Sequence, residues 1–329
     1  MKILIVGYGS SGKRYHKILN KLYPNYIIKI FSVTNIKKKN NIFLKNHNEI
    51  IDYKPNISIL SNPATLRFKF CKLLSKINSH LLIEKPLSSN LADANKILKL
   101  LKKNNIITKI AYNLRFLNSL GKLRSLLTKK IGRIYFIRVE VGQYLPTWRN
   151  ILYTNSVSAK KIFGGGVLLE LSHEIDYLLY LFGEFKSVFC KVQKISDLRI
   201  DVEDIANIIL YNKKKFYINV SLDFCRKDKI RKFYISGKRG SLDLDLNSGN
   251  IKYYNKKNKW INISFSKQNT QETYQKVLVE FIRIVKNNTN KMKRPIKNCK
   301  LSSLQQGYEV LKIIAAAKKS SRVNRMIAL

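Results

Sequence analysis

Three glycines near the start of the chain stand at a spacing that binds phosphate. A short apolar run leads into Gly7, Gly9 and Gly12, and a helical apolar repeat follows them, so the chain carries G-x-G-x-x-G between a strand and a helix. In this setting Gly7 permits a tight turn, Gly9 lets the backbone approach a pyrophosphate, and Gly12 lets the helix pack closely on the strand. The N–H groups at the helix start, those of Ser10 and Ser11, then face the anion. The pattern predicts a dinucleotide site, with an ordinary strand–turn–helix as the alternative.

A lysine follows another predicted strand of the same region. Glu84, Lys85 and Pro86 come directly after His80–Ile83, at the edge where open parallel sheets bind their ligands. Pro86 restricts the backbone of Lys85 to extended conformations and so fixes the direction of its side chain. A constrained ammonium group beside a nicotinamide can donate or accept a proton while hydride moves. Lys85 is therefore a candidate for catalysis and for binding both cofactor and substrate.

The end of the second predicted strand, Tyr26–Val33, bears on the choice between NAD and NADP. A site that prefers NAD usually has an acidic residue there, which accepts hydrogen bonds from the ribose hydroxyls. This chain has Ser32, Thr34 and Lys37, followed by two more lysines. Hydroxyls and cations thus stand where a 2′-phosphate would lie, and NADP is slightly favoured over NAD. Alternatively, the lysines only reflect a general excess of basic residues.

The elements that position these residues alternate between strand and helix over the first third of the chain. Besides the strands already named, strands are predicted at Ile57–Ser61 and Ile106–Ala111, and helices at Leu66–Lys76 and Asn90–Lys103. A short helix is predicted over Ile42–Asp52. This alternation predicts a doubly wound parallel sheet of the Rossmann type.

The pattern changes in the second half of the chain. A long alternating strand is predicted at Gly132–Gln143, and a glycine triplet at 164–166 precedes an apolar helix that ends near Phe182. Mostly strands and then two closing helices follow. The predicted fold class is α/β, with a dinucleotide-binding Rossmann domain at residues 1–116. An α+β domain with a large, mostly antiparallel sheet follows at residues 117–329, for substrate binding and oligomerisation.

Composition limits the environment of the protein. No apolar stretch approaches the roughly 20 residues that span a bilayer, and the first apolar run is too short for a signal peptide. The cysteines are scattered, with no C-x-x-C pair and no histidine at metal spacing. We therefore expect buried thiols, no disulfide framework, no metal site, no membrane contact and a cytoplasmic location.

The charge of the chain is strongly positive. With 63 Lys and Arg against 20 Asp and Glu, the formal net charge is +43. Such a surface attracts nucleic acids, but the basic residues are spread along the whole chain and no nucleic-acid-binding motif accompanies them. An RNA- or polyanion-associated protein is kept as a less favoured alternative.

Further motifs stand along the chain in a recognisable order. They are Gly7-x-Gly9-x-x-Gly12, Ser61-Asn62-Pro63, Glu84-Lys85-Pro86, Tyr112-Asn113-Leu114-Arg115-Phe116 and Gly164-Gly165-Gly166-Val-Leu-Leu-Glu170-Leu-Ser-His173-Glu174-Ile-Asp176. With them, the sequence resembles the Gfo/Idh/MocA family (glucose–fructose oxidoreductase and inositol dehydrogenase) over nearly its whole length. The resemblance implies an NAD(P)-dependent oxidoreductase that transfers hydride to or from a carbinol or ketone carbon of a sugar. It also implies a homodimer or homotetramer that pairs through the open face of the second sheet.

The resemblance assigns roles to individual residues. Lys85 is the active-site lysine, and its peptide bond to Pro86 is expected to be cis. The counterpart of His173 lies on the first helix of the sheet domain and faces the nicotinamide, so His173 is expected to act in proton transfer and substrate binding; a core histidine is the alternative. The resemblance also places Asn62, Pro63, Arg67, Glu84 and Asn113 at the cofactor, and Tyr112 and Arg115 at the substrate.

Two positions depart from the family pattern. Family members commonly carry an acid four residues before this histidine, where this chain has Leu169, whereas Glu170 stands three residues before it. Both spacings keep two side chains on one helical face, so Glu170 is a candidate to orient His173, and Asp176 is an alternative partner. Arg67 stands where relatives carry a histidine, and it either binds a cofactor phosphate or lies on the surface.

A polar and aromatic stretch follows the long strand of the second half. Gln143, Trp148, Arg149 and Tyr153 offer aromatic faces to C–H surfaces, and amide and guanidinium groups to hydroxyls or a carboxylate. A packed loop anchored by Trp148 is the alternative. The stretch resembles the family branch found with bacterial surface-sugar and sialic-acid-like biosynthesis. The sequence therefore predicts an oxidoreductase acting on a sugar or sugar derivative, including a nucleotide-linked one; a non-catalytic dinucleotide-binding relative is the alternative.

Overall fold

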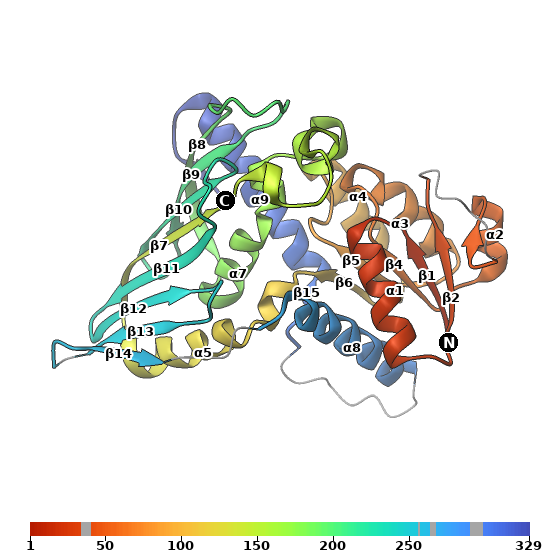
Figure 1. Cartoon of the computed structure of the whole chain (residues 1–329), viewed down its shortest axis with the longest axis horizontal. Helices are drawn as coiled ribbons and strands as arrows, with labels where there is room; N and C mark the ends of the chain where they lie inside the picture. Colours follow the sequence, from red (N-terminus) through yellow and green to blue (C-terminus); the bar gives the residue numbers. More distant parts are fainter. Residues whose placement is uncertain (34–40, 256, 264–267, 290–298) are drawn as a thin grey trace. The chain divides into compact units, whose positions relative to one another are not determined.

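The chain forms two compact units (Figure 1). The computed structural model describes residues 1–33, 41–255, 257–263, 268–289 and 299–329. Unit 1 comprises Met1–Asn113 and Thr270–Leu311, and unit 2 comprises Leu114–Asn269 and Lys312–Leu329.

This division differs from the expected single boundary after residue 116. The first crossing lies close to that position, but residues 270–311 return to unit 1. The return occurs because helix α8 (Thr270–Thr289) packs beside helix α1 (Ser10–Leu22).

Unit 1 is built on a parallel sheet. Among the described residues the sheet has seven strands in the order β15-β6-β5-β4-β1-β2-β3, and only β15 runs antiparallel to its neighbour. The strands are β1 (Lys2–Val6), β2 (Ile27–Phe31), β3 (Phe43–Leu44), β4 (Ile57–Leu60), β5 (His80–Glu84), β6 (Thr108–Ala111) and β15 (Ser302–Ser303). The strand order reverses between β1 and β4, which makes that point the switch of a Rossmann sheet, where open α/β sheets bind ligands.

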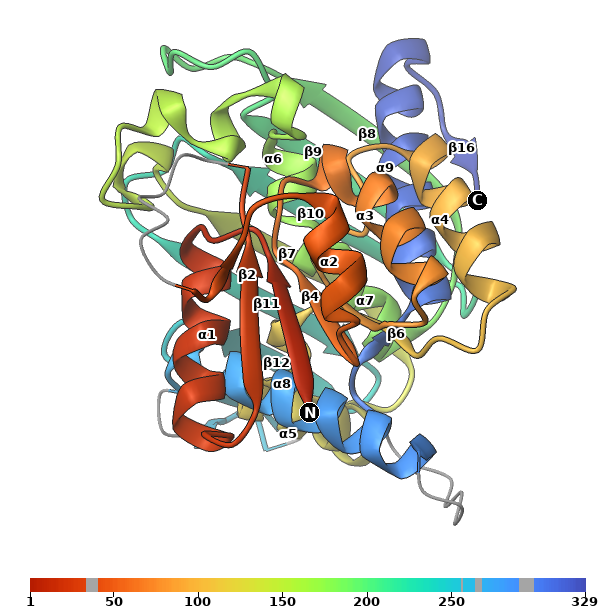
Figure 2. The same ribbon diagram turned by 90° about the vertical axis from the view of Figure 1, so that its right-hand side faces the viewer.

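Helices cover both faces of this sheet (Figure 2). Besides α1 and α8 they are α2 (His47–Tyr53), α3 (Arg67–Lys76) and α4 (Leu91–Lys102). Helix α3 packs beside α4. The whole of β4 and the last four residues of β1 and β5 are buried, as a sheet covered on both faces requires.

The predicted helix over Ile42–Asp52 is wrong in its first part. That segment begins with the short strand β3, and α2 starts only after Asn46. The Asn46 Oδ1 atom accepts a hydrogen bond from the backbone N–H of Glu49 at 2.9 Å, which caps the helix there.

Unit 2 is built on a large, mostly antiparallel sheet. In the described part of the chain its order is β14-β13-β12-β11-β7-β10-β9-β8-β16, and the pair β7–β10 is parallel. The strands are β7 (Ile134–Gly142), β8 (Phe185–Gln193), β9 (Ile205–Asn212), β10 (Tyr217–Asp223), β11 (Ile230–Gly237), β12 (Gly240–Asp245), β13 (Ile251–Tyr254), β14 (Trp260–Ile263) and β16 (Ile327–Ala328). In β7, buried Ile137, Val139 and Val141 alternate with exposed residues, so one face of the sheet carries the core.

Among the described residues, the α-helices that belong wholly or partly to unit 2 are α5 (Asn118–Leu126), α6 (Val167–Glu170), α7 (Ser172–Phe182) and the second half of α9 (Leu304–Val323). The predicted single helix ending near Phe182 is interrupted at Leu171 (φ −97°, ψ 26°), which separates α6 from α7. Ser320 and Ser321 of α9 accept hydrogen bonds from the backbone N–H groups of Cys190 and Val192, and so fasten α9 to β8. No helix among the described residues is long and apolar enough to cross a membrane.

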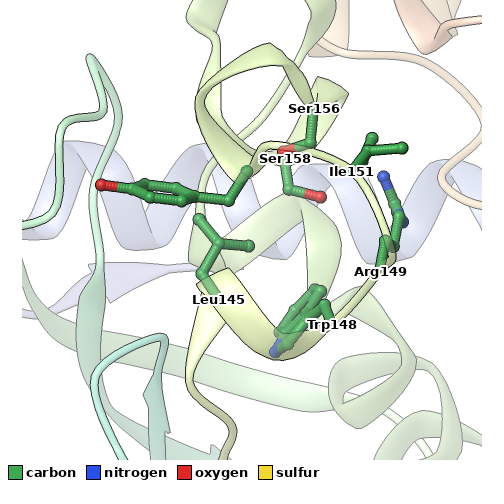
Figure 3. A pocket seen from close by; sticks show the side chains of 7 residues that line it. Leu145, Trp148, Arg149, Ile151, Ser156 and Ser158 are labelled. Atoms are coloured by element: carbon green, nitrogen blue, oxygen red, sulfur yellow. The ribbon is translucent and has the colours of Figure 1, made fainter.

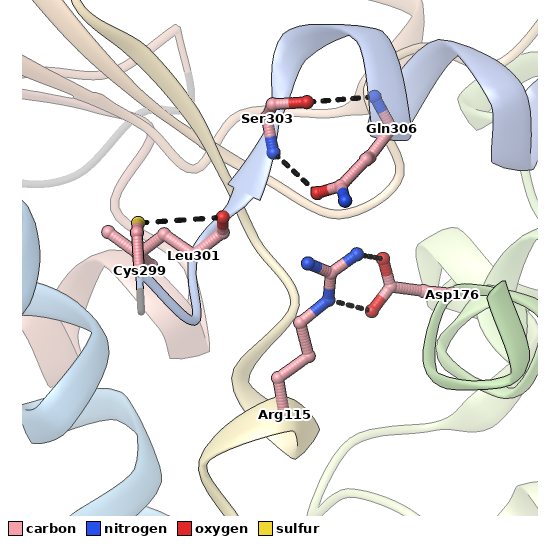
Figure 4. A network of polar contacts seen from close by, with 6 residues as sticks. All are labelled: Arg115, Asp176, Cys299, Leu301, Ser303 and Gln306. Carbon is pink, nitrogen blue, oxygen red and sulfur yellow. Dashed lines mark hydrogen bonds and ion pairs between the residues drawn. The ribbon is translucent and has the colours of Figure 1, made fainter. Parts of the chain in front are cut away.

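Helix α9 starts with a reciprocal pair of hydrogen bonds (Figure 4). The backbone N–H of Gln306 donates to the Ser303 hydroxyl at 3.1 Å, and the backbone N–H of Ser303 donates to the Gln306 side chain at 3.0 Å. Each bond satisfies a donor that the start of a helix leaves unpaired.

Replacing Ser303 with alanine should lower the free energy of unfolding by about 1 kcal/mol, because the N–H of Gln306 loses its acceptor. Urea unfolding followed by circular dichroism measures the change. Ser303→Thr, which keeps the hydroxyl, is the matched control and should lose much less. Identical unfolding midpoints for the alanine variant and the wild type would show that this cap contributes nothing.

Candidate active site

The candidate cofactor residues of unit 1 meet at the switch point between β1 and β4. Gly7 has a φ of +90°, and a Cβ on it would lie 2.6 Å from the backbone nitrogen of Asn62. A Cβ on Gly12 would collide with the carbonyl oxygen of Gly7. The Ser61 hydroxyl donates to that same carbonyl oxygen at 2.7 Å. Only glycine fits at positions 7 and 12, because backbone meets backbone there.

Gly9 is different, because nothing in the described chain requires a glycine at this position. Its φ is −75°, and apart from its chain neighbours no described atom lies within 4 Å of the place of its Cβ. Gly9 and Ser10 are exposed at the start of α1, whose first turn contains no acidic residue. The free N–H groups and the helix dipole favour an anion here. The space that a Cβ would fill is therefore available to the diphosphate of a dinucleotide, and the residues present fit that group.

Two more predicted cofactor residues, Asn62 and Pro63, follow β4 directly. Asn62 is 5% exposed, and its Oδ1 atom is buried without a hydrogen-bond partner among the described residues. Such an atom is an acceptor available to a ligand donor. Ser32, also buried, follows β2. Thr34 and Lys37 lie outside the described residues.

Arg67 is buried, which contradicts the expectation that it lies on the surface. Its side chain is 3% exposed. The Nη2 atom donates to the carbonyl oxygen of Asn62 at 3.4 Å and to that of Lys85 at 3.3 Å. Arg67 therefore braces the loop after β4 against the loop after β5, and its charge lies inside the predicted cofactor region.

The Glu84 carboxyl is bonded to helix α1 rather than exposed to a ligand. The Tyr15 hydroxyl donates to Glu84 Oε1 at 2.7 Å, and Glu84 is 5% exposed. Burial raises the pKa of Glu84 above its usual value, although the Tyr15 hydrogen bond and the charges of Arg67, Lys85 and Arg14 oppose the rise. The bond joins the helix that follows the glycine turn to the strand that ends at Lys85. The predicted role of Glu84 at the cofactor stays a prediction.

Lys85 is half-buried at the end of β5, and its peptide bond to Pro86 is cis, as the resemblance implied. Glu84 pairs with Ala111 in the β5–β6 register, so Lys85 and Tyr112 come next on neighbouring strands. Tyr112 is 1% exposed. The Asn113 amide donates to the Thr273 hydroxyl at 2.7 Å, which ties the end of β6 to α8.

In unit 2 the glycine triplet sets the start of α6. Gly166 has a φ of +104°, and a Cβ on it would lie 2.6 Å from the Glu203 carboxyl group. The N–H of Val167 then donates to the carbonyl oxygen of Glu203 at 3.0 Å. His173 is half-buried in the first turn of α7.

Glu170 ends α6, and its carboxylate lies 3.7 Å from Arg149 Nη2, so two predicted site residues meet. The break at Leu171 corrects the expectation that Glu170 and His173 share one continuous helical face, because α6 ends before α7 begins. His173 belongs to unit 2 and Lys85 to unit 1, so the approach of these two residues stays a prediction.

Arg115 and Asp176 form a buried ion pair (Figure 4). Arg115 Nε donates to one carboxylate oxygen at 2.8 Å, and Arg115 Nη2 donates to the other at 2.7 Å. The side chains are 2% and 0% exposed. Both carboxylate oxygens of Asp176 thus accept from Arg115, and the roles predicted for Arg115 at the substrate and for Asp176 as a partner of His173 stay predictions. The two-point contact joins the segment after β6 to α7.

Four predicted substrate residues, Gln143, Trp148, Arg149 and Tyr153, lie in the loop after β7. Trp148 Nε1 donates to the carbonyl oxygen of Gln143 at 2.9 Å, and the indole packs edge-on against Phe224 with ring centroids 5.1 Å apart. Trp148 is therefore an anchor of the loop, as the alternative interpretation held. The Tyr153 hydroxyl accepts a hydrogen bond from the N–H of Arg199 at 3.1 Å.

This loop encloses a small hollow that opens to solvent (Figure 3). Its cavity volume is about 10 Å³, which is room for about one water-sized group. The lining side chains are Leu145, Trp148, Arg149, Ile151, Tyr153, Ser156 and Ser158. Sequence reasoning missed Ser156 and Ser158, because two serines in a polar loop carry no signal; only their packing against the glycine triplet places them here.

The cysteines and potential metal ligands offer no further chemistry. Burial raises the pKa values of Cys71 and Cys190 to about 12, so both thiols stay protonated at neutral pH. Within the described ranges, no group of histidine, cysteine and acidic side chains is arranged to hold a metal ion.

Glu84→Gln should change how stability depends on pH. Because the folded-state pKa of Glu84 is raised above its usual 4.5, the wild type loses stability as pH rises from about that value to the folded pKa. The slope of this loss is at most about 1.4 kcal/mol per pH unit. Glutamine still accepts the hydrogen bond from Tyr15 but does not ionise. The free energy of unfolding of the variant therefore rises relative to that of the wild type over this pH window, and the difference between the two is constant above it. Urea unfolding from pH 4 to 8 measures this; parallel curves would contradict the buried-carboxyl assignment.

Comparison with known proteins supports both units. Residues 1–112 match the family described as "Oxidoreductase family, NAD-binding Rossmann fold", and residues 122–243 match the "GFO/IDH/MocA C-terminal domain". The chain is similar to an oxidoreductase of Formosa agariphila, at 22% identity over 204 residues that span 60% of this chain and 61% of that protein. It is also similar to glucose-6-phosphate 3-dehydrogenase of Bacillus subtilis, at 23% identity over 68% of each chain.

A solved structure shares the fold over the whole chain. Levoglucosan dehydrogenase, in complex with NADH and levoglucosan, superposes with a TM-score of 0.81 at 17% identity, covering 100% of this chain and 99% of that one. The strand order of unit 1, the large antiparallel sheet of unit 2 and the two sequence matches agree. The chain therefore belongs to the Gfo/Idh/MocA family of oxidoreductases, with an NAD-binding Rossmann domain followed by the C-terminal domain of that family.

Proposed function

We propose that the chain is an NAD(P)-dependent oxidoreductase that moves hydride between the nicotinamide and a carbinol or ketone carbon of a sugar or sugar derivative. The observation that carries the proposal is the open helix start at Gly9, at the switch point of a sheet in which Lys85 and Tyr112 follow directly after strands β5 and β6. Relatives named as glucose-6-phosphate and levoglucosan dehydrogenases support the substrate class.

The chain's own residues divide the work. When bound, the nicotinamide supplies or accepts the hydride. Gly9, Ser10 and the following N–H groups hold the diphosphate, and Arg67 adds positive charge behind the loop after β4.

Lys85 and His173 share proton transfer in this proposal. As a carbinol is oxidised, its O–H proton passes to the lysine amine or the imidazole, and in the reverse direction one of them protonates the new alkoxide. Glu170 or Asp176 orients His173 in this proposal; the Glu170 carboxylate lies 3.7 Å from Arg149, and Asp176 accepts from Arg115.

The proposal extends to cofactor choice. NADP is favoured slightly, on the residues Ser32, Thr34 and Lys37. A nucleotide-linked sugar and a role in surface polysaccharide biosynthesis rest on the loop after β7, and a cytoplasmic location rests on composition.

Pairing of two or four copies through the open face of the unit 2 sheet is also proposed. That face carries a row of aromatic residues on three neighbouring strands, because Tyr211 and Phe136 both pair with Tyr217. Tyr217 is 49% exposed, and its ring centroid lies 4.8 Å from that of Tyr211.

Gly9→Ala should weaken binding of NADH and NADPH by at least about tenfold, because the new Cβ takes space assigned to the diphosphate. Gly121→Ala is the matched control, since a Cβ there also meets no atom within 4 Å, and it should leave binding unchanged. Fluorescence titration measures both cofactors in one series, and tighter binding of NADPH supports the proposed preference. Equal dissociation constants for Gly9→Ala and the wild type would overturn the placement of the diphosphate.

Lys85→Met and His173→Ala should each lower kcat/KM on the best sugar substrate by about 100-fold or more, the usual loss of a proton-transfer group. Lys99→Met, on the exposed side of α4, is the control and should keep wild-type activity. NAD(P)H absorbance measures turnover. If either variant stays within a fewfold of the wild type, that residue does not transfer the proton.

A further inference from the structure

The hollow in unit 2 contains two buried hydroxyls that the family resemblance does not explain. Ser156 and Ser158 are 4% and 1% exposed, and their Oγ atoms have no hydrogen-bond partner among the described residues. In Figure 3 the Ser158 hydroxyl points into the space bounded by Leu145, Trp148 and Arg149. Leaving a buried hydroxyl without a partner is costly, so a group that enters the hollow and bonds to it is favoured.

The loop that carries these serines is held in place by the glycine triplet. The N–H of Gly166 donates to the carbonyl oxygen of Ser158 at 3.1 Å, and the N–H of Gly165 donates to that of Lys160 at 3.0 Å. A Cβ on Gly165 would lie 2.5 Å from the carbonyl oxygen of Val157. The same glycines start α6, so the two hydroxyls are fixed relative to Glu170 before any ligand binds.

The other side chains that line the hollow determine which kind of group it can bind. Leu145 and the ring of Trp148 are apolar walls, and the indole N–H is already bonded to Gln143. The positive charge of Arg149 faces the Glu170 carboxylate at 3.7 Å. This pair leaves little net charge at the hollow to attract a carboxylate or phosphate. A serine hydroxyl both donates and accepts, and so matches a neutral hydroxyl.

We propose that Ser158, with Ser156 beside it, binds a neutral ring hydroxyl of the substrate and so selects a polyol ring over an acidic sugar at this position. The inference rests on the proposed function and deepens it. The reacting oxygen is assigned to Lys85 and His173, so the hydroxyl held here is a different one. Only that hydroxyl enters, because the hollow has room for about one water-sized group, and the carbon skeleton stays at the open mouth.

Removing the Ser158 hydroxyl and individual substrate hydroxyls, separately and together, tests the proposal. The wild type is first assayed with NAD and NADP on levoglucosan, myo-inositol, glucose 6-phosphate and glucuronate. Ser158→Ala is then compared with the wild type on the best substrate and on its monodeoxy analogues. Thr108→Val is the matched control, because Thr108 also has a buried hydroxyl without a partner among the described residues, but on β6.

We expect Ser158→Ala to lower kcat/KM about tenfold on the full substrate, mainly through KM, and Thr108→Val to leave it unchanged. For the monodeoxy analogue that lacks the bound hydroxyl, the wild type and Ser158→Ala should have equal kcat/KM, because neither protein can make the hydrogen bond. Ser156→Ala should give a smaller loss with the same analogue. The proposal is overturned if Ser158→Ala loses the same factor in kcat/KM on every analogue, or if it behaves as the wild type. A preference of the wild type for glucuronate would also overturn it.

A wild-type crystal soaked in myo-inositol tests the subsite without any variant. We expect a ligand oxygen about 2.8 Å from Ser158 Oγ. If the wild type oxidises no member of the panel, the proposed function fails, but myo-inositol seated on Ser158 still supports the subsite. An empty hollow at saturating myo-inositol contradicts the subsite, whatever the enzyme oxidises.

Discussion

Backbone segments that approach more closely than a side chain allows hold both halves of the candidate site in place. In unit 1 the backbone of Gly7 lies directly against that of Asn62, and the backbone of Gly12 lies against the carbonyl oxygen of Gly7, so only glycine fits at both positions. In unit 2 Gly165 and Gly166 lie against the serine loop and Glu203. Each contact sets the start of a helix, α1 or α6. The helix starts in turn position the Glu170 carboxylate and the N–H groups that we propose bind the diphosphate.

Buried ionic and polar groups fix the remaining geometry. The chain has few acidic residues, yet Glu84, Glu174, Asp176 and Asp204 are all buried. Glu84 accepts from Tyr15, Asp176 pairs with Arg115, Glu174 pairs with Arg231, and Asp204 accepts from the backbone N–H groups of Ile195 and Ser196. A buried carboxylate without such a partner is strongly unfavourable. The acids of this basic chain thus join helices and strands inside each unit, whereas many of the lysines are exposed.

Sequence patterns predicted the secondary structure at the centre of unit 1 well. Runs of buried apolar residues and the glycine spacing predicted β1, β4, β5 and the turn to α1, because these signals are local. The return of α8 to unit 1 escaped prediction, because a helical repeat does not say which sheet it covers. The break at Leu171 also escaped, since Val167–Phe182 contains neither glycine nor proline.

The roles of polar side chains were harder to predict than their positions. Arg115 and Asp176 stand 61 positions apart, and nothing local indicates that each satisfies the other. Nothing in the sequence around Arg67 distinguishes it from a surface arginine, yet its side chain donates to the carbonyl oxygens of two loops. Trp148 and Arg149 line the hollow, and their residue types singled them out in the sequence, but their contact with a substrate stays a prediction. Ser156 and Ser158 had no such mark.

The most direct test of the proposed proton transfer is how far Lys85 and His173 lie from the reacting oxygen of the substrate. A crystal structure of the wild type with NADH and a bound substrate gives the separations of Lys85 Nζ and of the nearer His173 ring nitrogen from the reacting oxygen. We expect both within about 3.5 Å, the reach of a hydrogen bond that transfers a proton. If only one of them, or neither, comes near that oxygen while the nicotinamide lies over the substrate carbon, the shared role of lysine and histidine is wrong.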